Sequence, residues 1–376
     1  LRGWARSRGL RTIFGPFGSS ISFLALPGKS FGGDWNAFVF SLSIPLTAWL
    51  AVRFFVPFYR RSGNLSAYAH LEQRFGPWAR TYAVVCYILV QIGRTGTILY
   101  LLALALAPLT GLGIPALILI ASVAVIAYTL FGGMEAVIWT AVVQSIVLIG
   151  GALACVAILL FGMPHGPGQL FEIAAQHRKF SLGDLGPSLK ISTLWVVFAY
   201  GLCINLQNFG IDQSYVQRYH AAKDDAAAAR SVWLGGLLYL PVSAIFLFIG
   251  TALFAYYPAS PDLLPASIDA ANRPDAVFPH FIATRLPVGI AGLVIAAIFA
   301  AAQSTVSGSI NCSATLVLCD VYRRYFNPRA DDRTAMRVLR ATSLAFGILG
   351  TAAAFSMMHI RSALDAWWDI AGAFSG

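Results

Sequence analysis

Charge is scarce in this sequence. Asp, Glu, Lys and Arg together make up 11% of the 376 residues, whereas 58% are hydrophobic. Soluble domains carry about 25% charged residues, so a chain with a mean hydropathy of +0.70 has too little polar surface for a cytosolic enzyme or a disordered protein. The composition instead predicts apolar membrane spans of roughly 20 residues each, and the length leaves room for about ten of them.

Paired cysteines and the common catalytic motifs are also missing. The five cysteines lie inside apolar stretches without paired spacing, which excludes a disulfide framework or a zinc site. The sequence has no His-Glu-x-x-His, no phosphate-binding loop and no Gly-x-Ser-x-Gly. A membrane protease, an ATP-driven pump and a hydrolase are therefore disfavoured, and the chain is not expected to be an enzyme.

The formal charge of +10 does not indicate a nucleic-acid partner. The basic residues form short clusters between apolar stretches, as orientation signals do in membrane proteins. Most of them fall near 1–11, 60–80, 218–230 and 323–340, which we expect on the cytoplasmic side. The chain is thus expected to be a multi-pass protein of the plasma (inner) membrane, with the lipid bilayer as its surroundings.

The apolar stretches define an expected order of spans. They lie at about 10–28, 35–58, 77–108, 114–131, 135–161, 190–218, 228–257, 287–322 and 334–358, with a partial tenth span from Leu364 and an amphipathic segment at 65–75. Residues 1–162 would form the first half of an all-α core and 163–189 an extracellular loop. Residues 190–376 would form a second, inverted half. Because the chain lacks an initiator Met and ends within an apolar stretch, we expect it to be a fragment.

Two of these spans are interrupted by polar or flexible residues. The first is broken at Gly15, Pro16 and Gly18, and the sixth is broken between Asn205 and Gln213. Unwound backbone at membrane depth is tolerated where it lines a cavity. A pair of interrupted spans at matching places in two halves is typical of secondary transporters with inverted repeats.

A sodium site is suggested by the eighth span. The Ala301 carbonyl and the Ser304 and Thr305 hydroxyls have i, i+3, i+4 spacing and so share one helical face. Neutral oxygens of this kind suit Na⁺ better than Ca²⁺ or a transition metal. Carbonyls freed near Gly15 and Gly18 would complete five ligands. The alternative is that these hydroxyls only allow close helix packing.

Several stretches resemble the sodium:solute symporter family. They are 19–28 (SSISFLALPG), 132–140 (GGMEAVIWT) with Gln144, 212–219 (DQSYVQRY), and 296–322 with its Asn311 and Asp320-Val-Tyr. The resemblance implies a LeuT-type fold of five plus five inverted spans, with discontinuous helices 1 and 6. It also implies one further span before this core and about three after it. By resemblance, Gly15, Gly18, Ala301, Ser304 and Thr305 fall on the family's main sodium site.

One position departs from the family pattern. The family usually has Asp directly after the Trp-Thr of the Gly-Gly motif, and Ala141 stands there in this chain. In members that have it, that Asp serves the inner sodium path or a second sodium site. Its replacement implies one coupled ion or impaired coupling.

Arg94 lies midway along the third span, between Gly93 and Gly96. A charge at this depth costs at least about 2.5–3.5 kcal/mol and is a functional candidate by default. A guanidinium can hold a carboxylate with two parallel hydrogen bonds. The alternative is a structural Arg that binds freed carbonyls of the first span or extends to an interface. Some members of the family recognise sialic acids or short monocarboxylates, which fits an acid-binding Arg.

The remaining substrate candidates flank the two interruptions. They are Ser19, Ser20 and Ser22 at the first, Ser41 opposite on the second span, and Asn205, Asn208 and Phe209 at the other. Some family members keep aromatic gating residues at the positions of Asn208 and Phe209, and Asn208 departs from that pattern. The sequence therefore predicts Na⁺-coupled symport of a small polar solute, an organic acid, by alternating access. A sensor domain of a kinase-fused protein and an uncoupled facilitator stay open as alternatives.

Overall fold

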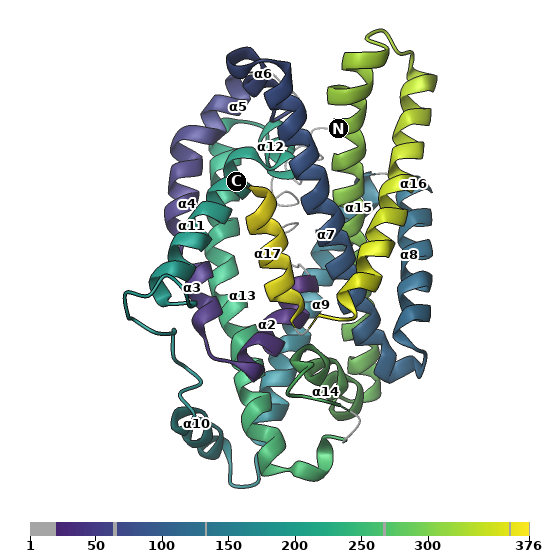
Figure 1. The fold of residues 1–376 in the computed structure, drawn as a ribbon. Coiled ribbons are helices and arrows are strands. Elements are labelled where there is room, and N and C mark those ends of the chain that lie inside the picture. The colour runs from purple at the N-terminus through teal and green to yellow at the C-terminus, as the bar shows by residue number, and fades with distance from the viewer. Residues whose placement is uncertain (1–19, 63–65, 132–133, 266–267, 361, 376) are drawn as a thin grey trace.

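The computed structural model describes residues 20–62, 66–131, 134–265, 268–360 and 362–375. These residues form helices and connecting loops, with no strand among them. The long helices run roughly side by side along the long axis of the molecule (Figure 1). The predicted all-α architecture is confirmed within this part of the chain.

The first half begins with a short helix and a bent span. α2 (Ser20–Gly32) leads to a run of α3 (Asn36–Leu42), α4 (Ile44–Leu50), η1 (Ala51–Phe55) and α5 (Val56–Ser62). The amphipathic segment is α6 (Ala69–Phe75), and the next three spans are α7 (Pro77–Thr110), α8 (Ile114–Phe131) and α9 (Met134–Phe161).

The second half has a more elaborate outline. Its elements are α10 (Pro167–Gln176), α11 (Leu194–Ile211), α12 (Gln213–Ala221), α13 (Asp225–Ala259), η2 (Pro261–Leu263), η3 (Pro274–Ala276), α14 (Val277–Arg285), α15 (Val288–Leu316), η4 (Val317–Phe326), α16 (Asp332–Met357) and α17 (Ala363–Ser375). The polar stretch at 163–188 contains α10, and the polar loop at 258–286 contains η2, η3 and α14.

Helix ends follow local signals in the sequence. Gly76, at φ +87°, turns the chain into Pro77, the first residue of α7, and Gly111 ends that helix in the left-handed conformation. The side chains of Asp212 and Asp224 accept hydrogen bonds from the first turns of α12 and α13. Thr193 caps α11 in the same way.

The sixth span is interrupted at one residue only. We expected polar residues from Asn205 onward to break it, but α11 continues to Ile211 and only Asp212 is extended, at φ −71° and ψ 122°. The reason is that the Asp212 carboxylate accepts a 2.7 Å hydrogen bond from the Ser214 N–H and starts a new helix. The amide side chains before it make no such cap.

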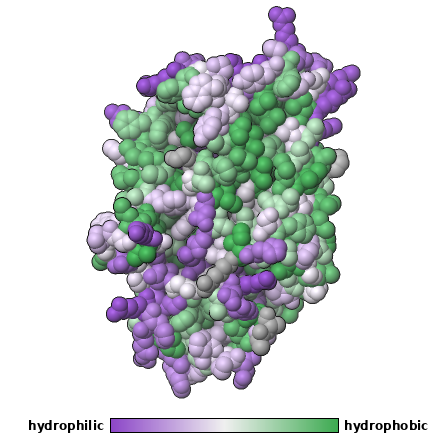
Figure 2. Space-filling view, viewed as in Figure 1, coloured by the Kyte–Doolittle hydropathy of each residue, from purple (hydrophilic) through white to green (hydrophobic). Residues whose placement is uncertain are grey.

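Six helices in the described part are long and apolar enough to cross a membrane. Two shorter apolar segments, Ile114–Leu130 and Ser145–Phe161, belong to α8 and α9. α2 and α17 have 13 residues each, too few to span a bilayer alone. On the face that Figure 2 shows, hydrophobic residues predominate between the two ends, and hydrophilic residues gather toward both ends.

α2 is held beside α13 by a close backbone approach. A Cβ on Gly250 would lie 2.0 Å from the Pro27 carbonyl oxygen, so only glycine fits there. Ser30, which is fully buried, donates a 2.6 Å hydrogen bond to the Leu247 carbonyl. Since α2 also packs against α7 and α15, this contact positions the helix that follows the first predicted interruption.

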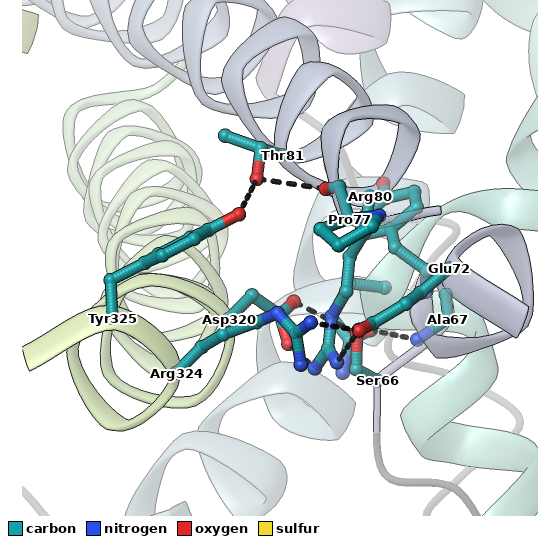
Figure 3. A network of polar contacts seen from close by, with 11 residues as sticks. Ser66, Ala67, Glu72, Pro77, Arg80, Thr81, Asp320, Arg324 and Tyr325 are labelled. Atoms are coloured by element: carbon teal, nitrogen blue, oxygen red, sulfur yellow. Dashed lines mark hydrogen bonds and ion pairs between the residues drawn. The ribbon is translucent and has the colours of Figure 1, made fainter. Parts of the chain in front are cut away.

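One end of the molecule, where α6, α12 and η4 lie, is rich in arginine, and we call it the arginine-rich end (Figure 1). A polar network joins α6, α7 and η4 there (Figure 3). The fully buried Asp320 carboxylate pairs with Arg80 and accepts a 2.9 Å hydrogen bond from Ser66. Glu72 pairs with both Arg80 and Arg324. α10 and α14 lie toward the opposite end of the molecule (Figure 1), which we call the outer end because the basic clusters predict it outside the membrane.

Candidate functional site

A cavity of about 580 Å³ lies between the helices of the two halves. Its walls come mainly from α3, α7, α11, α12, α13 and α17. The lining includes Ser41, Arg94, Asn205, Asn208 and Phe209, all predicted from sequence as substrate candidates. The fold therefore brings together residues separated by more than 150 positions along the chain.

Among the residues that the structure describes, Arg94 is one of three charged ones that line this cavity, together with Asp212 and Arg218. It lies midway along α7 and is half-buried, with its guanidinium carbon 5.9 Å from the centroid of the Trp367 ring. Within the described residues it has no carboxylate partner, and its buried Nε has no hydrogen-bond acceptor. An arginine at membrane depth is normally paired, so the unpaired Arg94 is a candidate for binding an anionic ligand.

The polar residues of α3 and α11 meet opposite α7. Asn205 donates through Nδ2 to the Ser43 hydroxyl at 3.0 Å, which fixes the side-chain amide between the two helices. Ser41 is 2% exposed and lines the cavity. Phe209 is buried edge-on against Tyr215, with ring centroids 5.4 Å apart. Asn208 is half-buried on the same wall.

Three further lining residues were absent from our sequence predictions. Gln91 lies one turn before Arg94 on α7, and Trp367 and Trp368 come from α17. Trp368 stacks on Phe40 with ring centroids 5.5 Å apart, and its carbonyl accepts a 2.7 Å hydrogen bond from a tyrosine of α11. The only sequence feature that could have indicated these residues is the pair of adjacent tryptophans at the start of the tenth span. Their place in the cavity wall depends on how α17 packs against the other helices, which the sequence does not show.

The predicted sodium ligands of α15 lie apart from this cavity lining. The Thr305 hydroxyl donates to the Ala301 carbonyl at 2.9 Å, so these two oxygens are adjacent. Ala301 is fully buried, and Ser304 and Thr305 are half-buried on a helix that packs against α2. A hydroxyl oxygen that donates its proton to a carbonyl still has lone pairs for a cation.

Part of both predicted sites lies outside the described residues. This applies to Gly15, Gly18 and Ser19, and to the side chains of Ser20 and Ser22, whose backbone forms the first turn of α2. Among the described residues, no group of three or more His, Cys, Asp or Glu side chains is arranged to hold a metal ion.

Comparison with known proteins gives a consistent picture. The model of the sodium:solute symporter family matches residues 8–373. The sodium/sialic acid symporter SiaT of Proteus mirabilis is 34% identical over 377 residues, which cover 100% of this chain and 75% of that protein. The sodium/sialic acid symporter NanT of Aliivibrio fischeri is 32% identical, over 98% of this chain and 71% of that protein.

A solved structure extends the likeness to three dimensions. The substrate-bound, outward-open state of a Na⁺-coupled sialic acid symporter superposes with a TM-score of 0.87 at 34% identity. The match covers 100% of this chain and 78% of that one. The LeuT-type fold expected from the sequence is therefore confirmed. The chain belongs to the sodium:solute symporter family and is a multi-pass membrane protein that couples solute transport to sodium.

Proposed function

We propose that this protein imports a carboxylate-bearing sugar acid of the sialic acid class together with Na⁺. The observation that carries the proposal is Arg94, a cation without an acidic partner in the described residues that lines a membrane-buried cavity. Two relatives, at 34% and 32% identity, are sodium/sialic acid symporters. A volume of about 580 Å³ is within the usual range for small-molecule sites.

The residues around Arg94 have separate roles in this proposal. The guanidinium binds the substrate carboxylate with two parallel hydrogen bonds. Ser41, Asn205 and Asn208 bind the polar substituents of the ring, and Phe209 closes the cavity beside them. The hydroxyls of Ser19, Ser20 and Ser22 contribute from the start of α2.

Sodium binds, in this proposal, between α15 and the part of the chain around Gly15 and Gly18. The oxygens of Ala301, Ser304 and Thr305 act with the carbonyls of Gly15 and Gly18. Because Ala141 stands where the family usually has Asp, we propose a single coupled ion. The ion holds α2 in the arrangement that binds substrate, so each ligand raises the affinity of the other by the same factor.

Alternating access follows from relative motion of two sets of packed helices. α7 packs against α8, α15 and α16, and α3 packs against α11, while α2 packs against α13 and also against α7 and α15. The proposed repeat relates 1–162 to 190–376 across the loop at 163–189. The arginine-rich end would face the cytoplasm of the plasma (inner) membrane, as basic clusters do.

Uptake of radiolabelled N-acetylneuraminate into proteoliposomes tests this function. An inward Na⁺ gradient should drive accumulation, and equal Na⁺ on both sides or replacement by K⁺ should abolish it. Arg94→Ala should eliminate uptake, and Arg94→Lys should retain a fraction, since one ammonium cannot form the two-pronged contact. Unchanged uptake by Arg94→Ala would refute the anchor, and sodium-independent flux would refute coupling.

A further inference from the structure

Gln91 is a buried polar residue in the cavity wall that no part of the proposed mechanism uses. It lies on α7, three residues before Arg94, so the two side chains share one face of the helix. Both line the cavity. Gln91 is only 3% exposed, although its amide carries two hydrogen-bond donors and an acceptor.

The amide carbonyl of Gln91 has no hydrogen-bond donor within the described residues. A buried acceptor without a partner is disfavoured, and each such group in a native protein requires an explanation. If Gln91 only filled space, a leucine or methionine would do so without leaving a polar group unsatisfied. The free hydrogen-bonding capacity therefore points to a ligand group.

The neighbours of Gln91 define the chemistry of that group. Arg94, one turn further along, is suited to a carboxylate. A group that satisfies the Gln91 carbonyl oxygen must donate a hydrogen bond to it, as a hydroxyl or an amide N–H does. Trp367, whose ring lies under the Arg94 guanidinium, lines the same cavity and adds an aromatic side chain to its wall. These three side chains together match a hydroxylated ring acid.

We propose that Gln91 is a specificity-determining residue that selects acids bearing a hydroxyl or amide group close to the carboxylate. The inference rests on the proposed function, since it assumes that Arg94 binds an acid. An acid without such a group would leave the Gln91 amide unsatisfied in the loaded cavity. Removal of a buried hydrogen bond of this kind weakens binding about 10- to 100-fold.

Two acids with rings of equal size test the inference. Glucuronate carries ring hydroxyls, and cyclohexanecarboxylate carries none. Each is used to inhibit Na⁺-driven uptake of labelled N-acetylneuraminate in proteoliposomes, and each is also used to stabilise the purified protein against heat, a measurement that needs no transport. For the wild-type protein, the ratio of the cyclohexanecarboxylate inhibition constant to the glucuronate inhibition constant should be about 10 to 100. In Gln91→Leu this ratio should fall close to one, chiefly through weaker glucuronate binding.

Gln207→Leu is the matched control, because Gln207 is a glutamine of α11 that lines the same cavity and is half-buried. It should keep the wild-type ratio. The inference is overturned if Gln91→Leu keeps the wild-type ratio, if Gln207→Leu loses it to the same extent, or if the wild-type protein has no preference. If the wild-type protein binds none of N-acetylneuraminate, glucuronate and cyclohexanecarboxylate, the proposed function itself is overturned.

Discussion

Lys29 of α2 and Asp365 of α17 form a two-pronged ion pair beside η3. The Lys29 ammonium lies 2.7 Å from one carboxylate oxygen and 2.8 Å from the other. The pair joins residues 336 positions apart and lies in the wall of a second, outer pocket. Directly beside it, the buried carboxylate of Asp275 in η3 accepts a 2.8 Å hydrogen bond from the Ala363 N–H, at the start of α17.

Asp275 makes the stability of this outer contact depend on pH. Its pKa is raised from 3.8 to about 7, chiefly by burial; the Ala363 N–H and Lys29 lower the pKa, and the Asp365 carboxylate raises it. Tyr100 of α7 also interacts with this carboxyl. Because the folded-state pKa is the higher one, the contribution to stability is fully present below about pH 4. It is lost as the pH rises through about 7.

We therefore expect Asp275→Asn to unfold at a higher temperature than the wild type at pH 8, since the amide carries no buried charge. The difference should shrink toward pH 5, because the wild-type carboxyl becomes protonated there. At about 1.4 kcal/mol per pKa unit, the penalty that the variant avoids is a few kcal/mol at most. Thermal unfolding in detergent between pH 5 and 8 measures it. A constant difference between the two proteins across this range would contradict the assignment.

Asp320 is expected to be indispensable for the arginine-rich end. Asp320→Ala leaves Arg80, whose side chain is 15% exposed, without its buried partner, and breaking such a pair costs about 3–5 kcal/mol. Arg324→Gln is the control, because the Arg324 side chain is 31% exposed and Glu72 still forms its ion pair with Arg80 in that variant. Exposed ion pairs contribute about 0.2–1 kcal/mol to stability. Melting temperatures of the purified variants compare the two. A larger loss for Arg324→Gln would show that the buried acid is not the centre of the network.

Thr305 is expected to control the sodium dependence of transport. Thr305→Ala removes one proposed ligand and should raise the Na⁺ concentration for half-maximal uptake roughly 10-fold or more, as loss of a bond to a charged group does. Thr315→Ala is a matched control: it removes the same hydroxyl from the same helix, where it donates to the Asn311 carbonyl at 2.8 Å. Uptake measured against Na⁺ concentration distinguishes them. Equal shifts in both variants would assign the effect to helix packing.

Gly250 is expected to tolerate no side chain. Gly250→Ala places a Cβ 2.0 Å from the Pro27 carbonyl and must push α2 away from α13, at a cost of about 1–3 kcal/mol or more. Gly150→Ala, in the middle of α9, meets no atom within 4 Å and should be neutral or slightly stabilising, because alanine favours a helix. Thermal unfolding of both variants is the measurement. A stable, fully active Gly250→Ala would show that α2 can pack elsewhere.

Long apolar runs made most of the fold predictable. α7, α8 and α16 coincide with expected spans to within a few residues, because hydropathy over some 20 residues is a strong signal. Arg94 was equally visible, since a charge inside such a run is rare. The end of α11 was placed too early, because a polar residue in a helix differs from a cap only by the geometry of its side chain, as at Asp212.

The contacts that close the site were not predictable in the same way. Gln91 and Trp367 have ordinary sequence neighbours, and their place in the cavity wall depends on how α7 and α17 pack. The Lys29–Asp365 and Arg80–Asp320 pairs join positions hundreds of residues apart. No local pattern in the sequence specifies such a pairing.

α7 carries both Arg94 and Arg80 on one uninterrupted helix. They are fourteen residues apart, which corresponds to about 21 Å along the helix axis at 1.5 Å per residue. A tilt of about 5° around the level of Arg94 would displace Arg80 by about 2 Å over that distance, enough to break its contacts with Glu72 and Asp320. If Arg94 binds the solute as proposed, α7 would therefore transmit that event mechanically to the Arg80 contacts at the arginine-rich end.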